Sequence, residues 1–315
     1  MRAAPTLTRL AIPSFAKINW ILKVLGKRRD GYHQIKTLYQ TIDLNEEVVF
    51  ETTRHSSIQL EVRGRDVAHD KGNLLYRAAD LLQNSCGGQT GVKISLNKSI
   101  PVGAGLGGGS SNAAMALLAL NQLWQCRLTP EALAALAARL GSDVPFFLMG
   151  GTVAAGGRGE QLVPLPDTGE QQTLVLLYPN FALRSRDAYA LGQWDNCDEE
   201  GLLTGDTLDT TMQRLFRALD PKEDSWPLLE NDFENALFTH YPILVKAKSA
   251  LESAGCKRVM LCGSGSTLLG FGSTRPVKKT ADYLLKQQIG EVFICKTLSG
   301  DQYRTCLTNS GLNDV

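Results

Sequence analysis

Residues 101–114 read PVGAGLGGGSSNAA, a glycine-rich run that leads into two serines and a series of helix-forming residues. Because glycine has no Cβ, the backbone N–H groups of such a run can close around a large anion. We expect Ser110 and Ser111 to cap a helix whose N-terminus attracts phosphate through unpaired N–H groups and the positive end of its dipole. The run therefore predicts a phosphate-binding loop, with a flexible glycine linker as the alternative.

Two common phosphate-binding sequence patterns fit this glycine-rich run poorly. The nucleoside-triphosphatase loop GxxxxGK[ST] is excluded because no lysine follows the glycines. The dinucleotide-binding pattern GxGxxG matches at Gly103, Gly105 and Gly108. However, residues 97–102 separate the first glycine from the strand expected at 92–96, whereas the dinucleotide loop follows its strand at once. The literal match is therefore weak evidence for a dinucleotide-binding enzyme.

Lys17 and Asp143 are candidates for chemistry beside a phosphate. Asp143 follows the end of an expected helix, where an aspartate can accept a hydroxyl proton during phosphoryl transfer or can simply form a turn. Lys17 lies in a strand that is otherwise poor in charge, on the same face as Asn19. Its ammonium group can stabilise a moving phosphoryl group, or it can extend from a strand edge into water.

Three segments resemble the motifs of one family, the GHMP small-molecule kinases: GLGGGSSNAA after residue 104, AKIN at 16–19 and GSDVP at 141–145. The resemblance implies an enzyme that uses ATP and Mg²⁺ to phosphorylate the hydroxyl of a small molecule. It implies that Lys17 and Asp143 form the catalytic pair and that Asn19 touches the substrate. It also implies an ATP-binding set of Pro101, Val102, Gly103, Ala104, Gly105, Leu106, Gly107, Gly108, Gly109, Ser110, Ser111, Asn73 and Lys98. No acidic cluster identifies the magnesium ligands.

The segment RDGYH at 29–33 resembles one branch of this family, whose alcohol substrate carries a cytidine diphosphate group. The resemblance implies that Tyr32 and His33 hold the cytosine by stacking and hydrogen bonds. From the residues alone, Asp30 and Gly31 predict a hairpin turn, and His33 would be a histidine beside that turn. A further glycine segment at 261–267 resembles the motif that lines the site opposite the phosphate loop. At 185–189 the chain departs from the family pattern, which leaves the substrate-side loop open.

Three rival functions remain at this point. The first is a kinase of the same family that acts on mevalonate, phosphomevalonate or homoserine, none of which contains a cytosine. The second is a dinucleotide-dependent oxidoreductase that uses the literal GxGxxG. The third is a nucleotide-sensing module that binds ATP but transfers no phosphoryl group.

The bulk composition argues against charged polymers and membranes as partners. The chain has 315 residues and a formal net charge of +1, so no overall electrostatic attraction to nucleic acid or to an anionic membrane is expected. No run of about eighteen apolar residues predicts a membrane span, and the N-terminus lacks the apolar core of a secretory signal. We expect a cytoplasmic protein, or a plastid protein after processing if the source is a plant. The oligomeric state stays open.

The seven cysteines are scattered and none forms a CxxC pair: Cys86, Cys126, Cys197, Cys256, Cys262, Cys295 and Cys306. Neither a zinc site nor a disulfide framework is indicated by this spacing. The cysteine pattern is typical of a reducing compartment.

Hydrophobic periodicity predicts the elements that must position these residues. Strands are expected at 15–24, 33–44, 48–53, 57–62, 92–96, 152–155, 161–165, 173–178, 258–262 and 291–297, and helices at 73–83, after 109, 130–140, 211–219, 243–254 and 277–288. We expect Thr129 to cap the helix at 130–140, with Pro130 at its first position. The mixture is α+β, with a domain boundary near residues 164–169. We predict a two-domain GHMP kinase fold, with domains at 1–165 and 166–315 and the active site in the interdomain cleft.

Overall fold

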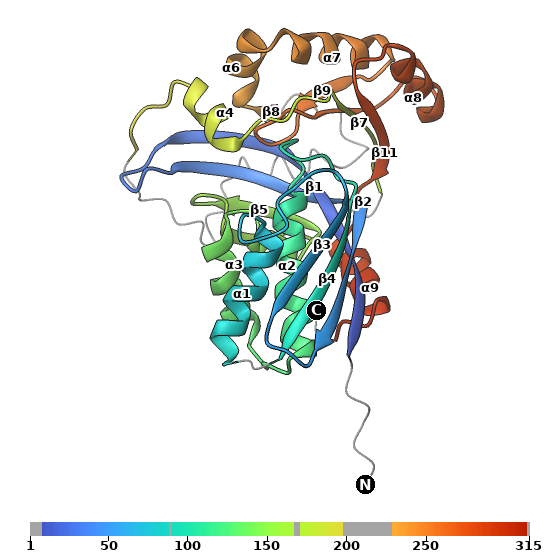
Figure 1. Ribbon diagram of the computed structural model, residues 1–315. Coiled ribbons are helices and arrows are strands. Elements are labelled where there is room, and N and C mark those ends of the chain that lie inside the picture. Colours follow the sequence, from blue (N-terminus) through green and yellow to red (C-terminus); the bar gives the residue numbers. More distant parts are fainter. Residues whose placement is uncertain (1–7, 88–89, 167–170, 198–228, 314–315) are drawn as a thin grey trace.

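The computed structural model describes residues 8–87, 90–166, 171–197 and 229–313. Two sheets dominate it, one in each half of the molecule (Figure 1). The first begins with β1 (Arg9–Lys27) and β2 (His33–Thr53), which form a long antiparallel hairpin. The turn predicted at Asp30 and Gly31 joins them, and Gly31 has a φ of 85°, which glycine adopts without strain. The hairpin is confirmed, but β2 is one continuous strand where we expected two.

The remaining strands extend this sheet on both sides of the hairpin. They are β3 (Ile58–Gly64), β4 (Gly91–Lys98), β5 (Thr152–Gly156), β6 (Gln161–Pro164) and β8 (Glu230–Asn231). The strand order is β3-β4-β2-β1-β8, with β5 paired to β2 and β6 paired to β5. The glycine run begins just after β4, which pairs with β3 on one side and with β2 on the other.

Helices cover one face of this first sheet. They are α1 (Leu74–Cys86), α2 (Gly108–Leu123), α3 (Pro130–Leu140) and the short 3₁₀ helix η1 (Pro145–Leu148). Thr129 caps α3 by accepting a hydrogen bond from the Ala132 N–H, and Pro130 takes the first helical position, as predicted. The core between helices and sheet is formed by aliphatic and aromatic side chains such as Phe50 and Phe146, both fully buried.

The second sheet has the order β11-β7-β10-β9. Its strands are β7 (Thr173–Tyr178), β9 (Arg258–Leu261), β10 (Leu268–Phe271) and β11 (Glu291–Lys296). Around it lie α4 (Ser185–Leu191), α6 (Phe233–His240), α7 (Pro242–Ser253) and α8 (Val277–Lys286), in the upper part of Figure 1. The sequence predicted β7, β9, β11, α7 and α8. It missed the helix α4 and the strand β10, which are only seven and four residues long. The helix expected at 211–219 lies outside the described residues.

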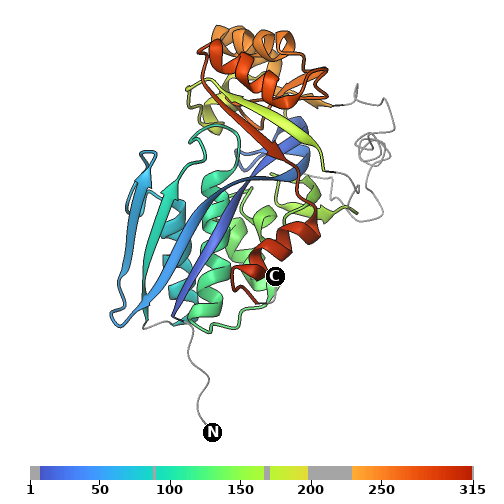
Figure 2. The same ribbon diagram turned by 90° about the vertical axis from the view of Figure 1, so that its right-hand side faces the viewer.

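The end of the chain returns to the first half of the molecule. α9 (Gly300–Asn309), drawn in red in Figure 2, packs beside the helices of the first layer. Tyr303 is fully buried there and its hydroxyl donates a 2.5 Å hydrogen bond to the Phe147 carbonyl. The sequence missed this helix, whose apolar residues are few. The division into 1–165 and 166–315 stays a prediction, and residues of α9 pack into the core of the first part.

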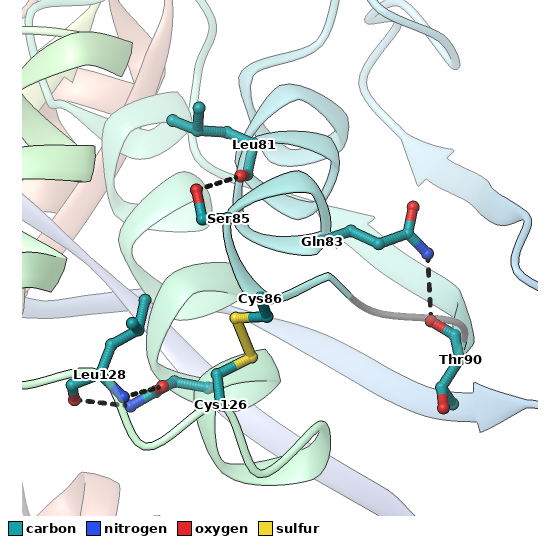
Figure 3. Close-up of a disulfide and its surroundings, with 8 residues drawn as sticks. Leu81, Gln83, Ser85, Cys86, Thr90, Cys126 and Leu128 are labelled. Carbon is teal, nitrogen blue, oxygen red and sulfur yellow. Dashed lines mark hydrogen bonds between the residues drawn. A yellow bond between two sulfur atoms is a disulfide. The ribbon is translucent and has the colours of Figure 1, made fainter.

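One disulfide, between Cys86 and Cys126, corrects the expectation from the cysteine spacing (Figure 3). Cys86 ends α1, and Cys126 follows α2 by a few residues. Because α1 and α2 pack side by side in the same direction, their ends meet, and the two Cα atoms lie 5.6 Å apart although the residues are 40 positions apart in the sequence. Spacing alone cannot reveal such a pair, because tertiary packing creates it. The expected cytoplasmic location stays a prediction.

Among the described residues, no helix combines the length and the hydrophobicity that crossing a membrane requires.

Candidate active site

The phosphate loop joins β4 to α2 and follows a path that only glycine allows. Gly103, Gly105 and Gly107 have φ values of 62°, 77° and 71°, in the left-handed region. A Cβ on Gly105 would overlap the backbone carbonyl of Cys262, and one on Gly107 would lie 2.9 Å from the Lys17 side chain. The alternating glycines therefore let the loop pack tightly against β1 and against the turn after β9.

The helix after the loop begins differently from our expectation. Gly107 is the N-cap of α2 and forms no side-chain capping hydrogen bond. Ser110 and Ser111 instead lie within the first turn of the helix, which corrects the prediction that they cap it. The Ser111 hydroxyl is fully buried and accepts a 2.8 Å hydrogen bond from the Ser14 hydroxyl. The helix start keeps its unpaired N–H groups and positive dipole end, so it still suits phosphate.

Lys17 and Asp143 lie close together in the structure although they are 126 positions apart in the sequence. Lys17 Nζ lies 3.4 Å from Asp143 Oδ2, with the lysine side chain 4% exposed and the aspartate side chain 31% exposed. The backbone N–H of Lys17 donates a 2.9 Å hydrogen bond to the Leu106 carbonyl in the phosphate loop. The ion pair therefore sits directly beside the loop, with the carboxylate open to the cavity.

Other side chains orient this pair from both sides. Lys17 Nζ donates a 2.7 Å hydrogen bond to Asn19 Oδ1, which confirms that the two residues share one face of β1. Asn19 Nδ2 in turn donates to the Thr37 hydroxyl on β2. The Tyr39 hydroxyl donates a 3.0 Å hydrogen bond to Asp143 Oδ1. Burial, and then the adjacent Asp143 carboxylate, raise the pKa of Tyr39 well above its usual value, so this hydroxyl remains a donor.

A buried carboxylate, Glu46, holds both ends of the phosphate loop. Its Oε2 accepts 2.9 Å hydrogen bonds from the backbone N–H groups of Ser99 and Ile100, just before the loop. Its Oε1 accepts from Asn112 in α2 and from Lys98 Nζ, at 2.8 Å and 2.5 Å. Burial lowers the pKa of Lys98, although Glu46 opposes that shift. The sequence analysis missed Glu46, because nothing in its neighbourhood in the sequence distinguishes it from a surface glutamate.

A second glycine turn closes the site from the other half of the molecule. It runs from 263 to 266 after β9, where the further glycine motif was expected. Thr267 N–H donates to the Ala104 carbonyl in the phosphate loop at 3.2 Å. Asn231 Nδ2 donates to the carbonyls of Leu261 and Gly263, at 2.9 Å and 2.7 Å. The two glycine segments therefore pack against each other through backbone groups.

Aromatic residues gather on one part of the cavity wall. The His33 ring stacks on Tyr189 of α4, with centroids 4.4 Å apart and an interplanar angle of 13°. Trp194 meets His33 edge to face at 6.3 Å. Tyr32 is 52% exposed and the Arg158 guanidinium lies over its ring. Burial, and secondarily Lys27, lower the pKa of His33, which favours the neutral imidazole.

One cavity of about 1180 Å³ connects all these groups. Lys17, Asn19, Tyr32, His33, Asn73, Lys98, Asp143 and every loop residue from Pro101 to Ser110 line it. Ser111 does not belong to its lining, and Asn112 lines it instead. Asn73 also caps α1, since its side chain accepts from the Leu75 N–H and donates to the Ala68 carbonyl. Tyr39, Arg158, Tyr189 and Trp194 line the cavity without having been predicted.

The oxygen-bearing groups in this cavity fit a magnesium ion carried with a nucleotide. In the described part of the chain, no three His, Cys, Asp or Glu side chains are grouped so as to hold a metal ion by themselves. Mg²⁺ characteristically keeps several waters and binds through one or two protein groups together with phosphate oxygens. The Ser110 hydroxyl and the Asp143 carboxylate both face the cavity and can supply such contacts.

Comparisons with known proteins agree with this architecture. Family models for the GHMP kinases N terminal domain and for GHMP kinases C terminal match residues 73–151 and 214–289. The chain is 41% identical over 259 residues to the 4-diphosphocytidyl-2-C-methyl-D-erythritol kinase of Pelotomaculum thermopropionicum, which covers 81% of this chain and 86% of that protein. It is 36% identical to the enzyme of the same name from Moorella thermoacetica, with 92% of this chain and 99% of the relative covered.

Solved structures show the same relationship. A crystal structure of 4-(cytidine 5'-diphospho)-2C-methyl-D-erythritol kinase is similar, with a TM-score of 0.73, 30% identity and coverage of 91% of this chain and 99% of that one. A homoserine kinase from Cytophaga hutchinsonii has a TM-score of 0.68 at 16% identity, with 95% and 98% covered. At that identity the second match establishes a shared fold alone.

Proposed function

Since the chain belongs to the GHMP kinase family, in the branch of the 4-diphosphocytidyl-2-C-methyl-D-erythritol kinases, we propose that it phosphorylates the 2-hydroxyl of 4-diphosphocytidyl-2-C-methyl-D-erythritol with ATP. The product is the 2-phosphate, an intermediate of the non-mevalonate route to isoprenoid precursors. The observation that carries the proposal is a single cavity that is lined by the Lys17–Asp143 pair, by the phosphate loop and by an aromatic platform, which consists of Tyr32, His33, Tyr189 and Trp194.

In the proposed reaction, Asp143 accepts the proton of the substrate hydroxyl. The hydroxyl oxygen then bonds to the γ-phosphorus while the bond from that phosphorus to the β–γ bridging oxygen breaks, and ADP leaves. Tyr39 and Lys17 each hold one oxygen of the carboxylate, at 3.0 Å and 3.4 Å, which fixes its orientation. The charge of Lys17 also stabilises the negative charge that develops on the transferring group.

The phosphate loop and the start of α2 are proposed to bind the ATP phosphates. Their backbone N–H groups and the helix dipole favour negative charge there. Ser110, in the first turn of α2, is the residue best placed to hold Mg²⁺ together with the phosphates. When bound, Mg²⁺ would neutralise charge on the β- and γ-phosphate oxygens.

The aromatic platform is proposed to bind the cytosine. Tyr32 offers an exposed ring face, and neutral His33 offers one ring nitrogen as a donor and the other as an acceptor. Tyr189 and Trp194 hold the His33 ring in place. Mevalonate and homoserine carry no base, so a kinase for those alcohols has no use for such a platform.

The deciding experiment measures ATP-dependent phosphorylation of three alcohols by the purified protein. We expect transfer to 4-diphosphocytidyl-2-C-methyl-D-erythritol and none to mevalonate or homoserine. ³¹P NMR of the product measures the transfer. Transfer to a base-free alcohol at equal efficiency would indicate another GHMP kinase. ATP binding without transfer to any of them would indicate a nucleotide sensor. Nicotinamide dinucleotide binding in place of ATP would indicate the oxidoreductase.

A further inference from the structure

The turn between β5 and β6 lies close to two tyrosines of the cavity, Tyr39 and Tyr32. Next to Arg158, Gly159 lies so close to the Tyr39 hydroxyl that a Cβ there would come within 2.5 Å of it. The Tyr39 hydroxyl is the group that binds Asp143. The Arg158 guanidinium itself lies 4.6 Å from the centre of the Tyr32 ring. The turn that carries Arg158 therefore contacts both the tyrosine that binds Asp143 and the tyrosine that is proposed to hold the base.

The turn holds this position rigidly. Its Gly157 carbonyl accepts a 2.8 Å hydrogen bond from the Ile35 N–H on β2. The Arg158 N–H donates 2.6 Å to Glu160 Oε2, which closes the turn. The Arg158 side chain is 26% exposed and lines the cavity, so its charge is partly shielded from bulk water. A half-buried, fixed cation of this kind is suited to binding an anion.

The Arg158 guanidinium forms an ion pair with Glu160 on the same turn. Its Nε lies 3.6 Å from Glu160 Oε1, which is longer than a hydrogen bond. The cavity's deep lysines are held more closely. Lys98 Nζ lies 2.5 Å from Glu46, and Lys17 Nζ donates a 2.7 Å hydrogen bond to Asn19 in addition to its 3.4 Å ion pair with Asp143. Arg186 also lines the cavity, but its side chain is 75% exposed and pairs with Asp187.

The substrate of the proposed function, on which this inference rests, has its groups in a fixed order: base, ribose, diphosphate, alcohol. With the base on Tyr32 and His33 and the hydroxyl at Asp143, the diphosphate must pass between them. We propose that Arg158 binds this diphosphate and thereby makes the site select a cytidine diphosphate ester over a cytidine without phosphate. Stacking on Tyr32 leaves the in-plane N–H groups of the guanidinium directed outward, where they can pair with phosphate oxygens.

The test compares the binding of CDP and of cytidine to the wild-type protein and to Arg158→Met, by titration calorimetry and NMR. Methionine keeps an unbranched side chain over Tyr32 but removes the charge. We expect Arg158→Met to weaken CDP binding about 10- to 100-fold, the value of a lost charge-assisted contact, with cytidine binding unchanged. Arg158→Lys should fall between the two, because lysine keeps the charge but loses the bidentate geometry.

Glu160→Gln is the matched control, because it removes the ion pair but keeps an acceptor for the Arg158 N–H. CDP should bind this variant as tightly as the wild type or more tightly. If Glu160→Gln weakens CDP binding as much as Arg158→Met does, both changes act by disturbing the turn, and the proposal is wrong. It is equally wrong if Arg158→Met weakens cytidine and CDP alike, since Arg158 then acts through Tyr32.

Failure of the proposed function gives a different result. In that case the wild-type protein itself binds neither CDP nor cytidine and phosphorylates no cytidine-linked alcohol. Wild-type binding of both, together with undiminished CDP binding by Arg158→Met, would instead overturn only the role of Arg158.

Discussion

At the scale of single residues, the site is built around the Asp143 carboxylate and the two side chains that contact it. Lys17 and Tyr39 each approach one oxygen of Asp143, and the exposed part of the carboxylate faces the cavity. This arrangement restricts the rotation of the side chain while leaving an oxygen accessible to a hydroxyl. A carboxylate held in this way can act as a general base without moving during the reaction.

Replacing Asp143 by Asn tests that role. We expect kcat to fall at least about 10²-fold, because the amide cannot take the hydroxyl proton. The dissociation constant of ATP should change little, since the phosphate loop is untouched. Single-turnover assays and an ATP titration measure the two quantities. A variant that turns over at a near-normal rate would remove Asp143 from the base role.

If His33 binds the cytosine as proposed, substrate binding depends on pH. Burial lowers its pKa from the ordinary value of 6.5, so the neutral ring persists below that pH. We therefore expect the KM of the cytidine substrate to stay constant as pH falls to 6.5 and to rise only at more acidic values. A pH series of initial rates measures this, and His33→Gln should lose the dependence. A rise that begins above pH 6.5 would contradict the predicted direction.

At the scale of elements, the phosphate loop is positioned by groups outside it. Glu46 of β2 binds the strand end before the loop and Asn112 of the helix after it. The Glu46 side chain is completely buried, so its hydrogen bonds are shielded from water, which strengthens them. The loop geometry thus depends on β2 as much as on the loop's own glycines.

Glu46→Gln should weaken ATP binding more than alcohol binding. Breaking a buried ion pair leaves Lys98 without its counterion, which costs about 3–5 kcal/mol of stability. We also expect the KM of ATP to rise about tenfold or more, because small displacements of positioning groups have large kinetic effects. Glu47→Gln, at an exposed neighbour, is the control. Equal rises in both KM values would point to general unfolding.

The disulfide joins two elements whose other ends face the nucleotide site. Asn73, before α1, and Gly108, at the start of α2, both line the cavity, while Cys86 and Cys126 tie the far ends together. A covalent link there limits relative movement of the two helices. It also reduces the conformational freedom of the unfolded chain.

Removing this link with Cys126→Ser should lower the free energy of unfolding by about 2–4 kcal/mol, as expected for a loop of this length. Urea denaturation with and without reductant measures the loss, and Cys306→Ser, at a free and half-buried cysteine, is the control. Titration of all seven thiols in the unfolded, unreduced wild-type protein would show that the bond does not form in solution.

At the scale of the whole molecule, the two halves are joined in several places. β8 pairs with β1 of the first sheet although it lies late in the sequence. The last helix, α9, packs into the first core, with Tyr303 and Leu307 fully buried. The site between the halves is thus held by chain segments that cross in both directions. This arrangement fits the pairing of the two glycine segments through backbone contacts.

Tyr303→Phe tests how much the returning helix contributes. The change removes the hydrogen bond to the Phe147 carbonyl and leaves that buried acceptor without its partner. We expect a loss of about 1–3 kcal/mol in the free energy of unfolding, measured by urea denaturation. An unchanged midpoint would mean that α9 stabilises the core through its apolar contacts alone.

The local elements and most of the site could be predicted from the amino-acid sequence. The glycine run, the cap at Thr129 and the hairpin turn at Gly31 each act within a few residues, so their neighbours in the sequence suffice to identify them. Lys17 and Asp143 were candidates from their own sequence positions, and the motif resemblance added their pairing and the role of His33. The short elements α4 and β10 were missed, because only tertiary contacts stabilise segments of that length.

Tertiary structure alone decided which distant residues meet. Glu46 looks like a surface residue in the sequence, and its burial arises only when β2 passes beneath the phosphate loop. Cys86 and Cys126 pair because two helices pack side by side, and Tyr39 of β2 binds Asp143, which follows α3. Local sequence determines backbone preference and turn chemistry, whereas long-range contacts follow from how apolar faces are buried together, which no short segment encodes.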